Sequence, residues 1–317
     1  MRLCGTTLLL VLLGTAAAPT VARQATPPGY VGGAQCAGCH AEAARRHAGS
    51  HHDFAMQPAT PQTVLGDFAD GRFTNNSITS TFTRRGDDFF VRTDGPDGAL
   101  HDYRIAYTFG VEPLQQYLIE FPDGRLQALS VCWDTRPKAQ GGQRWYHLYA
   151  DEQVDFRDEL HWTGLTQNWN YMCAACHSTG LRRNYDAAAR RFDTTWSEVD
   201  VSCEACHGPG AAHADWARRG SDAAADPRKD LTVDLAARGG AWVLHDGEPI
   251  ARLAAPRDGG AQLETCGRCH ARATQIAEED ARGQGLAQTH AVALLEQGLY
   301  EPDGQMQGEV YEYGSFA

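Results

Sequence analysis

The most constraining feature of the sequence is a five-residue pattern, Cys-x-x-Cys-His, which occurs four times and contains eight of the ten cysteines. Attachment of c-type haem uses this pattern: both thiols bond covalently to the haem, and the adjoining histidine binds the iron. Composition alone would give roughly 0.01 copies in such a chain. We therefore expect four groups of haem c. Their thioether bonds would come from Cys36, Cys39, Cys173, Cys176, Cys203, Cys206, Cys266 and Cys269, and their proximal iron ligands would be His40, His177, His207 and His270.

Other uses of paired cysteines fit this pattern less well. Structural disulfides are common in exported proteins, but they do not require a histidine after every pair. Two C-x-x-C pairs can bind zinc tetrahedrally, but zinc would leave all four neighbouring histidines without a role. A thioredoxin-like redox motif needs one C-x-x-C in a βαβ setting, and the sequence shows no such setting. The pattern therefore favours covalent haem.

Residues 1–22 have the composition of a secretory signal peptide. A short basic start precedes an apolar run that is too short to span a bilayer comfortably, and small residues suit cleavage near Ala22 or Arg23. An uncleaved N-terminal anchor is the alternative. No later segment is apolar for long enough to cross a membrane, so we expect a periplasmic or secreted domain over 23–317 without a transmembrane segment.

Haem iron that only exchanges electrons usually has a second protein ligand opposite the first. Methionine cannot fill this role generally, because one of the four methionines is the initiator and Met172 adjoins Cys173. We therefore expect histidine on both sides of most irons. His101 and His245 fall in expected hairpins, where surface positions are favoured. The distal candidates are His52 (or its neighbour His51, although the spacing from Ser50 favours His52), His213, His290, His161 and His147.

Chain length limits which haem His213 can reach. Six residues separate it from His207, and so short a segment cannot readily pass around a porphyrin to its other face. His213 is therefore expected to bind a neighbouring haem; the alternative is an exposed helix residue. For the same reason His52, twelve residues after His40, is expected to serve another haem. Such crossed ligation would hold distant segments together, as bound metal does in small domains.

The other candidates have a structural alternative. His290 lies in a segment with helical apolar spacing, where a packed core histidine is the alternative to a ligand. His161 and His147 either complete a haem or form hydrogen bonds inside the core. Cys132 lies in an apolar, strand-like run and is expected to be a buried thiol without a redox role.

Strand composition dominates the long gap between the first and second motifs. Five stretches over 77–133 are separated by turn signals such as DGPDG, and they predict an antiparallel β meander inserted at about 76–135. The last three motifs crowd into about a hundred residues with short helices and a hairpin over 241–253, so their haems would pack together. The expected fold class is therefore α+β with low regular secondary structure, in which short helices wrap around a cluster of four haems.

The chain resembles the multihaem cytochromes of the cytochrome c-554 type, a family of tetrahaem periplasmic electron carriers. The resemblance is carried by the four motifs, the segment CEACHGPGAAH, the Ser-x-His of Ser50 to His52, and a late helix bearing His290. The segments over 107–129 and 141–149 look like a subset of relatives with more haem motifs and tetratricopeptide repeats. Those relatives run on where this chain ends in GEVYEYGSFA, so a truncated product is expected.

The resemblance also implies ligand pairs. The second haem, on His177, is the one that the family leaves without a protein sixth ligand, although His161 and His147 put that vacancy in doubt. At the other haems it implies His290 opposite His40, His52 opposite His207, and His213 opposite His270.

Electron transfer in the periplasm is the function that these features favour. The rival is a haem enzyme that acts on a small nitrogen or sulfur species at an open iron on the second haem; no C-x-x-C-Lys variant, which marks one nitrite reductase family, is present. A haem-bearing module of a larger multihaem assembly is a third alternative. The formal net charge of -12 argues against nucleic acid and favours redox partner proteins with basic docking surfaces.

Overall fold

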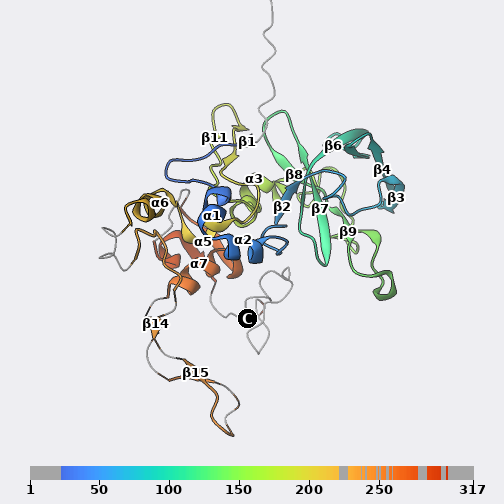
Figure 1. Ribbon diagram of the computed structural model, residues 1–317. Coiled ribbons are helices and arrows are strands. Elements are labelled where there is room, and N and C mark those ends of the chain that lie inside the picture. Colours follow the sequence, from blue (N-terminus) through green and yellow to red (C-terminus); the bar gives the residue numbers. More distant parts are fainter. Residues whose placement is uncertain are drawn as a thin grey trace, which may run out of the picture.

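A computed structural model describes residues 23–220, 228–277, 284–293 and 298, apart from positions 237, 240, 248, 250, 255, 256 and 259. The expected signal peptide at 1–22 and the GEVYEYGSFA ending lie outside the described residues. Figure 1 shows a large sheet on one side of the molecule and short helices on the other. Within the described ranges, no helix is long and apolar enough to span a membrane.

The large sheet is antiparallel and has nine strands. Seven of them lie in the order β10-β9-β7-β6-β5-β4-β3, while β2 pairs with β6 and β8 pairs with β7. The sheet nearly closes on itself, because its edge strands β3 and β10 contact each other. Its strands are β2 (Met56–Pro58), β3 (Ala69–Asn75), β4 (Ile78–Arg85), β5 (Asp88–Asp94), β6 (Leu100–Phe109), β7 (Leu114–Glu120), β8 (Leu126–Ala128), β9 (Val131–Asp134) and β10 (Arg144–His147).

Both faces of this sheet are covered, because its strands carry large apolar side chains in both directions. Alternate residues of a strand point to opposite faces. On β7, Tyr117 and Ile119 therefore enter one cluster, the first core, which is rich in aromatic residues and includes Phe82 and Trp145. Leu118 enters the second core, which consists of Met56, Phe109, Leu118, Leu126, Ala128, Trp169, Ala174 and Trp196.

The helices are short and carry the cysteine motifs. The longest described helix has ten residues. They are α1 (Gly33–Cys39), α2 (Ala41–His47), α3 (Trp169–Met172), α4 (Ala174–His177), α5 (Cys203–His207), α6 (Ala211–Arg218), α7 (Ala261–His270) and α8 (Leu286–Thr289), with the 3-10 turns η1 (Lys138–Gln140) and η2 (Leu165–Gln167).

Small two-stranded pairs connect these helices. One of them, β15 with β16, is the hairpin expected at 241–253. The pairs are β1 (Arg23–Gln24) with β13 (Thr195–Trp196), β11 (Tyr185–Asp186) with β12 (Arg191–Phe192), β14 (Arg238–Gly239) with β17 (Arg257–Asp258), β15 (Trp242–Val243) with β16 (Arg252–Leu253), and β18 (Ala273–Gln275) with β19 (His290–Val292).

The expected fold class is wrong. All five predicted stretches do form strands, but the sheet that they build is the main element of the described chain, and short helices wrapped around four haems are not its architecture. The physical reason is that the strands bury a core of their own. Phe82 on β4 stacks on Trp145 of β10 with ring centres 3.6 Å apart, as part of an aromatic core that the side chains of the sheet form themselves.

The late helix expected around His290 is also different. It ends at Thr289, and His290 begins strand β19, where it pairs with Gln275 of β18. The apolar residues beyond position 293 that suggested a longer helix, Leu295 and Leu299, lie outside the described residues.

Candidate functional site

The cysteine motifs lie on helices that meet in pairs. The first motif occupies α1, the third α5 and the fourth α7, while the second starts at Cys173, between α3 and α4. The cysteines of each pair are three positions apart, so the two thiols emerge from one side of a helical turn. Helix α1 contacts α5, and α4 contacts α7. The fold therefore brings the first motif to the third, and the second motif to the fourth.

The contact between α1 and α5 involves the thiols themselves. Burial, with the neighbouring Cys203 and Glu204, raises the pKa of the Cys36 thiol to about 11. Cys36, Cys39, Cys203 and Cys266 form no disulfide. Among the described residues, no group of three or more His, Cys, Asp or Glu side chains is arranged to hold a metal ion by itself, as a zinc site of two C-x-x-C pairs would be.

Two motif histidines lie opposite histidines from elsewhere in the chain. The ring centres of His40 and His213 are 6.0 Å apart, and those of His52 and His270 are 6.2 Å apart. Iron held between two imidazoles has metal–nitrogen bonds of about 2 Å, and each ring centre lies about 1 Å beyond its nitrogen, so the centres would be roughly 6 Å apart. Both pairs therefore have the ring separation that an iron between two imidazoles requires.

Hydrogen bonds orient several of these imidazoles as metal ligands are usually oriented. Nδ1 of His213 donates to the carbonyl of Lys229 at 2.7 Å, and Nδ1 of His177 donates to the carbonyl of Ala55 at 2.8 Å. Such bonds fix the ring and leave Nε2 for a metal. Nδ1 of His290 is likewise engaged, with the hydroxyl of Thr289 at 2.8 Å.

Burial favours the neutral, metal-binding form of two of these rings. Burial lowers the pKa of His177. Burial and then the adjacent His270 lower the pKa of His52. A neutral imidazole is the form that binds a metal.

These pairs differ from those that the resemblance implied. His213 lies beside His40 rather than His270, and His52 lies beside His270 rather than His207. His213 does lie beside the histidine of another motif, as its short distance along the chain from His207 requires. The pairs depend on how distant segments fold back, and no local pattern encodes that.

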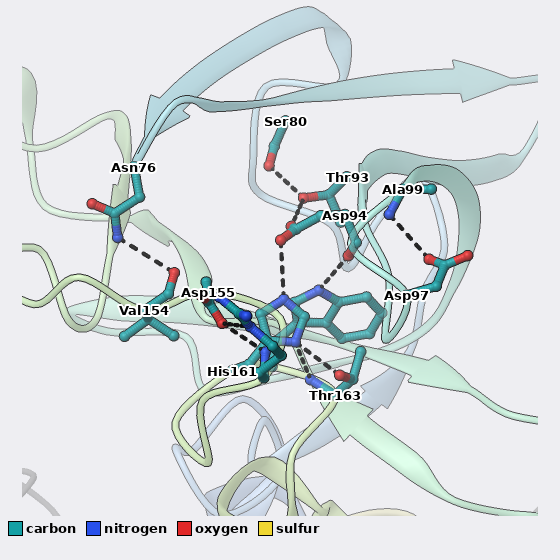
Figure 2. Close-up of polar contacts among 12 residues, drawn as sticks. Asn76, Ser80, Thr93, Asp94, Asp97, Ala99, Val154, Asp155, His161 and Thr163 are labelled. Atoms are coloured by element: carbon teal, nitrogen blue, oxygen red, sulfur yellow. Dashed lines mark hydrogen bonds and ion pairs between the residues drawn. The ribbon is translucent and has the colours of Figure 1, made fainter.

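His161 and His147 occupy a different place, a cavity of about 40 Å³ inside the sheet. Figure 2 shows His161 between Asp94 and Thr163. Its Nε2 lies 3.1 Å from Asp94 Oδ2, and its Nδ1 lies 2.8 Å from Thr163 Oγ1. Both ring nitrogens of His161 are thus engaged within the first core, where Trp162 also donates to the carbonyl of Asp94.

His147 lines the same cavity from β10, and its Nδ1 accepts from the backbone of Tyr149. Burial lowers its pKa. His177, in contrast, packs its ring against Phe109 of the second core, with ring centres 5.4 Å apart. The structure therefore brings His161 and His147 together with Asp94 and places His177 among other neighbours.

Sequence reasoning did not single out two buried carboxylates, one in the large sheet and one among the motif helices. Asp94 is the first residue of DGPDG, which signals a turn and hides the fact that its carboxylate is buried against His161. Glu204 lies between the cysteines of the third motif, and its side chain is fully buried. Its position inside the motif was the one available signal.

We expect Asp94→Asn to lower the free energy of unfolding by about 1–3 kcal/mol at neutral pH, because it disrupts a buried hydrogen-bonded pair. Burial raises the pKa of Asp94, but the hydrogen bond and charge of His161 and the Thr93 hydroxyl outweigh it, so the pKa lies below the ordinary 3.8. The stability that ionised Asp94 contributes is therefore complete above pH 3.8. It is lost as the pH falls through the lower pKa that Asp94 has in the folded protein.

Urea unfolding of both proteins over a pH series measures this difference. The difference in unfolding free energy between wild type and Asp94→Asn should become smaller as the pH falls. The control Asp87→Asn, which removes an exposed carboxylate, should change the unfolding free energy little at any pH. An unchanged free energy of unfolding in Asp94→Asn at neutral pH would show that the pair does not stabilise the fold.

Comparison with known protein families gives a match to part of the chain. Residues 132–208 match the family described as Cytochrome c554 and c-prime. No curated protein and no solved structure matches the chain. The matched segment is less than a third of the chain, but it contains the second and third motifs. The match supports a cytochrome c family, and with it haem c as the cofactor, for the segment that carries these two motifs.

Proposed function

We propose that the chain is a multihaem c-type cytochrome that transfers electrons through four covalently attached haems. The observation that carries the proposal is the meeting of His40 with His213 and of His52 with His270 at the separation that iron between two imidazoles needs. Each pair joins a motif histidine to one outside the motifs. Bound haem would supply reversible one-electron chemistry.

The residues of this chain attach and orient the four groups. Each Cys-x-x-Cys pair holds one haem, and the adjoining histidine is its proximal ligand. The second haem has His177 as its one histidine ligand. Each of the other three haems would be held by two histidines: His40 with His213, His270 with His52 and, from the candidates that remain, His207 with His290.

Helix contacts support transfer of electrons between neighbouring groups. Because α1 contacts α5 and α4 contacts α7, the haems of the first and third motifs and those of the second and fourth motifs would be neighbours. The sheet contributes a rigid support: Trp169 of α3 and Ala174 of α4 are fully buried in the second core against strands β2, β6, β7 and β8.

A potentiometric titration tests the proposal. The purified protein should take up four electrons per chain from a chemical reductant with no substrate present, and each step should change the haem absorbance. Uptake of fewer than four electrons per chain, in protein from a host that matures cytochromes, would contradict it.

We place this function outside the cytoplasm, because residues 1–22 have the composition of an export signal. A redox partner with a basic surface fits the formal net charge of -12. The same haem groups would also serve as one module of a larger multihaem assembly.

A second candidate function is catalysis at an open iron on the second haem. The positions of four histidines favour it: His213 and His52 lie beside other motifs, and His161 and His147 lie in the sheet cavity. A small nitrogen or sulfur species would then reach the iron opposite His177.

We expect cyanide or nitric oxide to change the spectrum of one haem in four, because three irons have two histidine ligands. Absorbance and electron paramagnetic resonance spectra with and without the ligand measure this. No change in any haem would rule out the second candidate and would leave electron transfer in place.

A further inference from the structure

A buried carboxylate lies where the first and third motifs meet. Glu204 of α5, between Cys203 and Cys206, is only 1 % exposed. A buried carboxylate is costly unless hydrogen bonds replace its water. Here the replacements are backbone N–H groups of the residues Val31 (3.0 and 3.1 Å), Gly32 (2.8 Å) and Gly210 (2.7 Å).

These donors mark the starts of two helices. Gly32 is the N-cap residue of α1, and Gly210 is the N-cap residue of α6. One carboxylate on α5 therefore binds the beginnings of α1 and α6 together. A backbone hydrogen bond of 3.0 Å from Ala211 to the carbonyl of Gly29 joins the same two segments.

The two helices bound by Glu204 lead to the two histidines of the first pair. Helix α1 ends at Cys39 and is followed at once by His40, while His213 lies in the first turn of α6. Their ring centres are 6.0 Å apart. We propose that Glu204 is a positioning residue that sets the separation of His40 and His213, and so completes the ligand pair of the first haem. This inference rests on the proposed function, since it needs haem at the first motif.

Both carboxylate oxygens take part, so the role requires glutamate. Oε1 accepts from Val31 and Gly210, whereas Oε2 accepts from Val31 and Gly32. Glutamine has one oxygen, and its NH₂ group would face a backbone N–H. Glutamine can therefore accept from Gly32, the N-cap residue of α1, or from Gly210, the N-cap residue of α6, but not from both.

Spectroscopy of Glu204→Gln tests the inference. We expect four haems to remain attached, and one low-spin haem per chain to be lost because His213 no longer meets the iron opposite His40. The affected haem should be the one that His213→Ala affects. The double variant should then lose no further low-spin haem, because both changes act on one ligand pair. General destabilisation would instead add to the effect of His213→Ala.

Glu42→Gln is the matched control. It removes the same charge two residues after His40, but Glu42 is exposed and pairs with Arg45 and Arg46 rather than with backbone N–H groups. It should leave all low-spin haems unchanged. An equal loss in Glu42→Gln would assign the effect to charge and overturn the positioning role.

Gly210→Ala tests the same contact if Glu204→Gln does not fold. A Cβ at Gly210 would lie 3.2 Å from Glu204 Oε1 and 3.3 Å from Val31 Cγ2, so it would shift α6 while keeping the carboxylate. We expect partial loss of the same low-spin haem. Unchanged spin states in this variant, or in a folded Glu204→Gln, would overturn the inference. A wild-type protein without four haems would instead contradict the proposed function.

Discussion

Replacing both Cys36 and Cys39 with alanine will yield a chain with one covalently bound haem fewer than the wild type. These two thiols supply both covalent attachments of the first haem. Helix α1 has no buried residue, so the loss of two sulfur atoms removes little core packing. The mass of the denatured chain should fall by one haem beyond the change in amino acids, and the pyridine haemochrome absorbance per chain should fall by a quarter, because one of four haems is lost.

Cys132→Ala provides the matched control for this change. Cys132 is a cysteine outside the motifs, wholly buried on β9, and burial raises the pKa of its thiol. Its replacement should leave all four haems attached. Equal haem content in the control and in the Cys36→Ala/Cys39→Ala variant would show that the first motif does not bind haem.

The variant His213→Ala will convert one haem from low spin to high spin and leave four attached. The reason is that His213 completes the ligand pair with His40, whereas the thioether bonds do not depend on it. Electron paramagnetic resonance and the absorbance spectrum of the oxidised protein measure the change. The exposed His101, paired with Asp97 in the β5–β6 hairpin, is the control, and His101→Ala should leave the spin states unchanged.

Adding His213→Ala to the Cys36→Ala/Cys39→Ala variant identifies the haem concerned. If His213 pairs with His40, the haem that would become high spin is already missing, so His213→Ala should add no high-spin signal to that variant. A new high-spin signal there would mean that His213 serves another haem, such as the one on His270 that the resemblance implied.

Local sequence pattern predicted the elements better than their arrangement. The strand composition and turn signals over 77–133 correctly indicated strands, because these signals lie in the residues of each strand and its turns. The sequence did not show how far the sheet extends beyond these strands. Strands β3 and β10 lie on either side of the predicted meander, and their contact through Trp145 depends on how the whole sheet curls.

The same limit applies to the candidate site. The cysteines and adjoining histidines form a local five-residue pattern, whereas the distal histidines must arrive from distant segments. His52 and His270 are 218 positions apart in the numbering, and their meeting depends on tertiary packing. The sequence around His161 gave no sign that Asp94 would engage its ring nitrogen.

Counting the bound haems tests the central claim most directly. The chain should be produced in a host that matures c-type cytochromes, and its intact mass should be measured together with its pyridine haemochrome absorbance. Four haems per chain are predicted, one for each Cys-x-x-Cys-His motif. A colourless product with the mass of its processed amino acids alone would contradict the account.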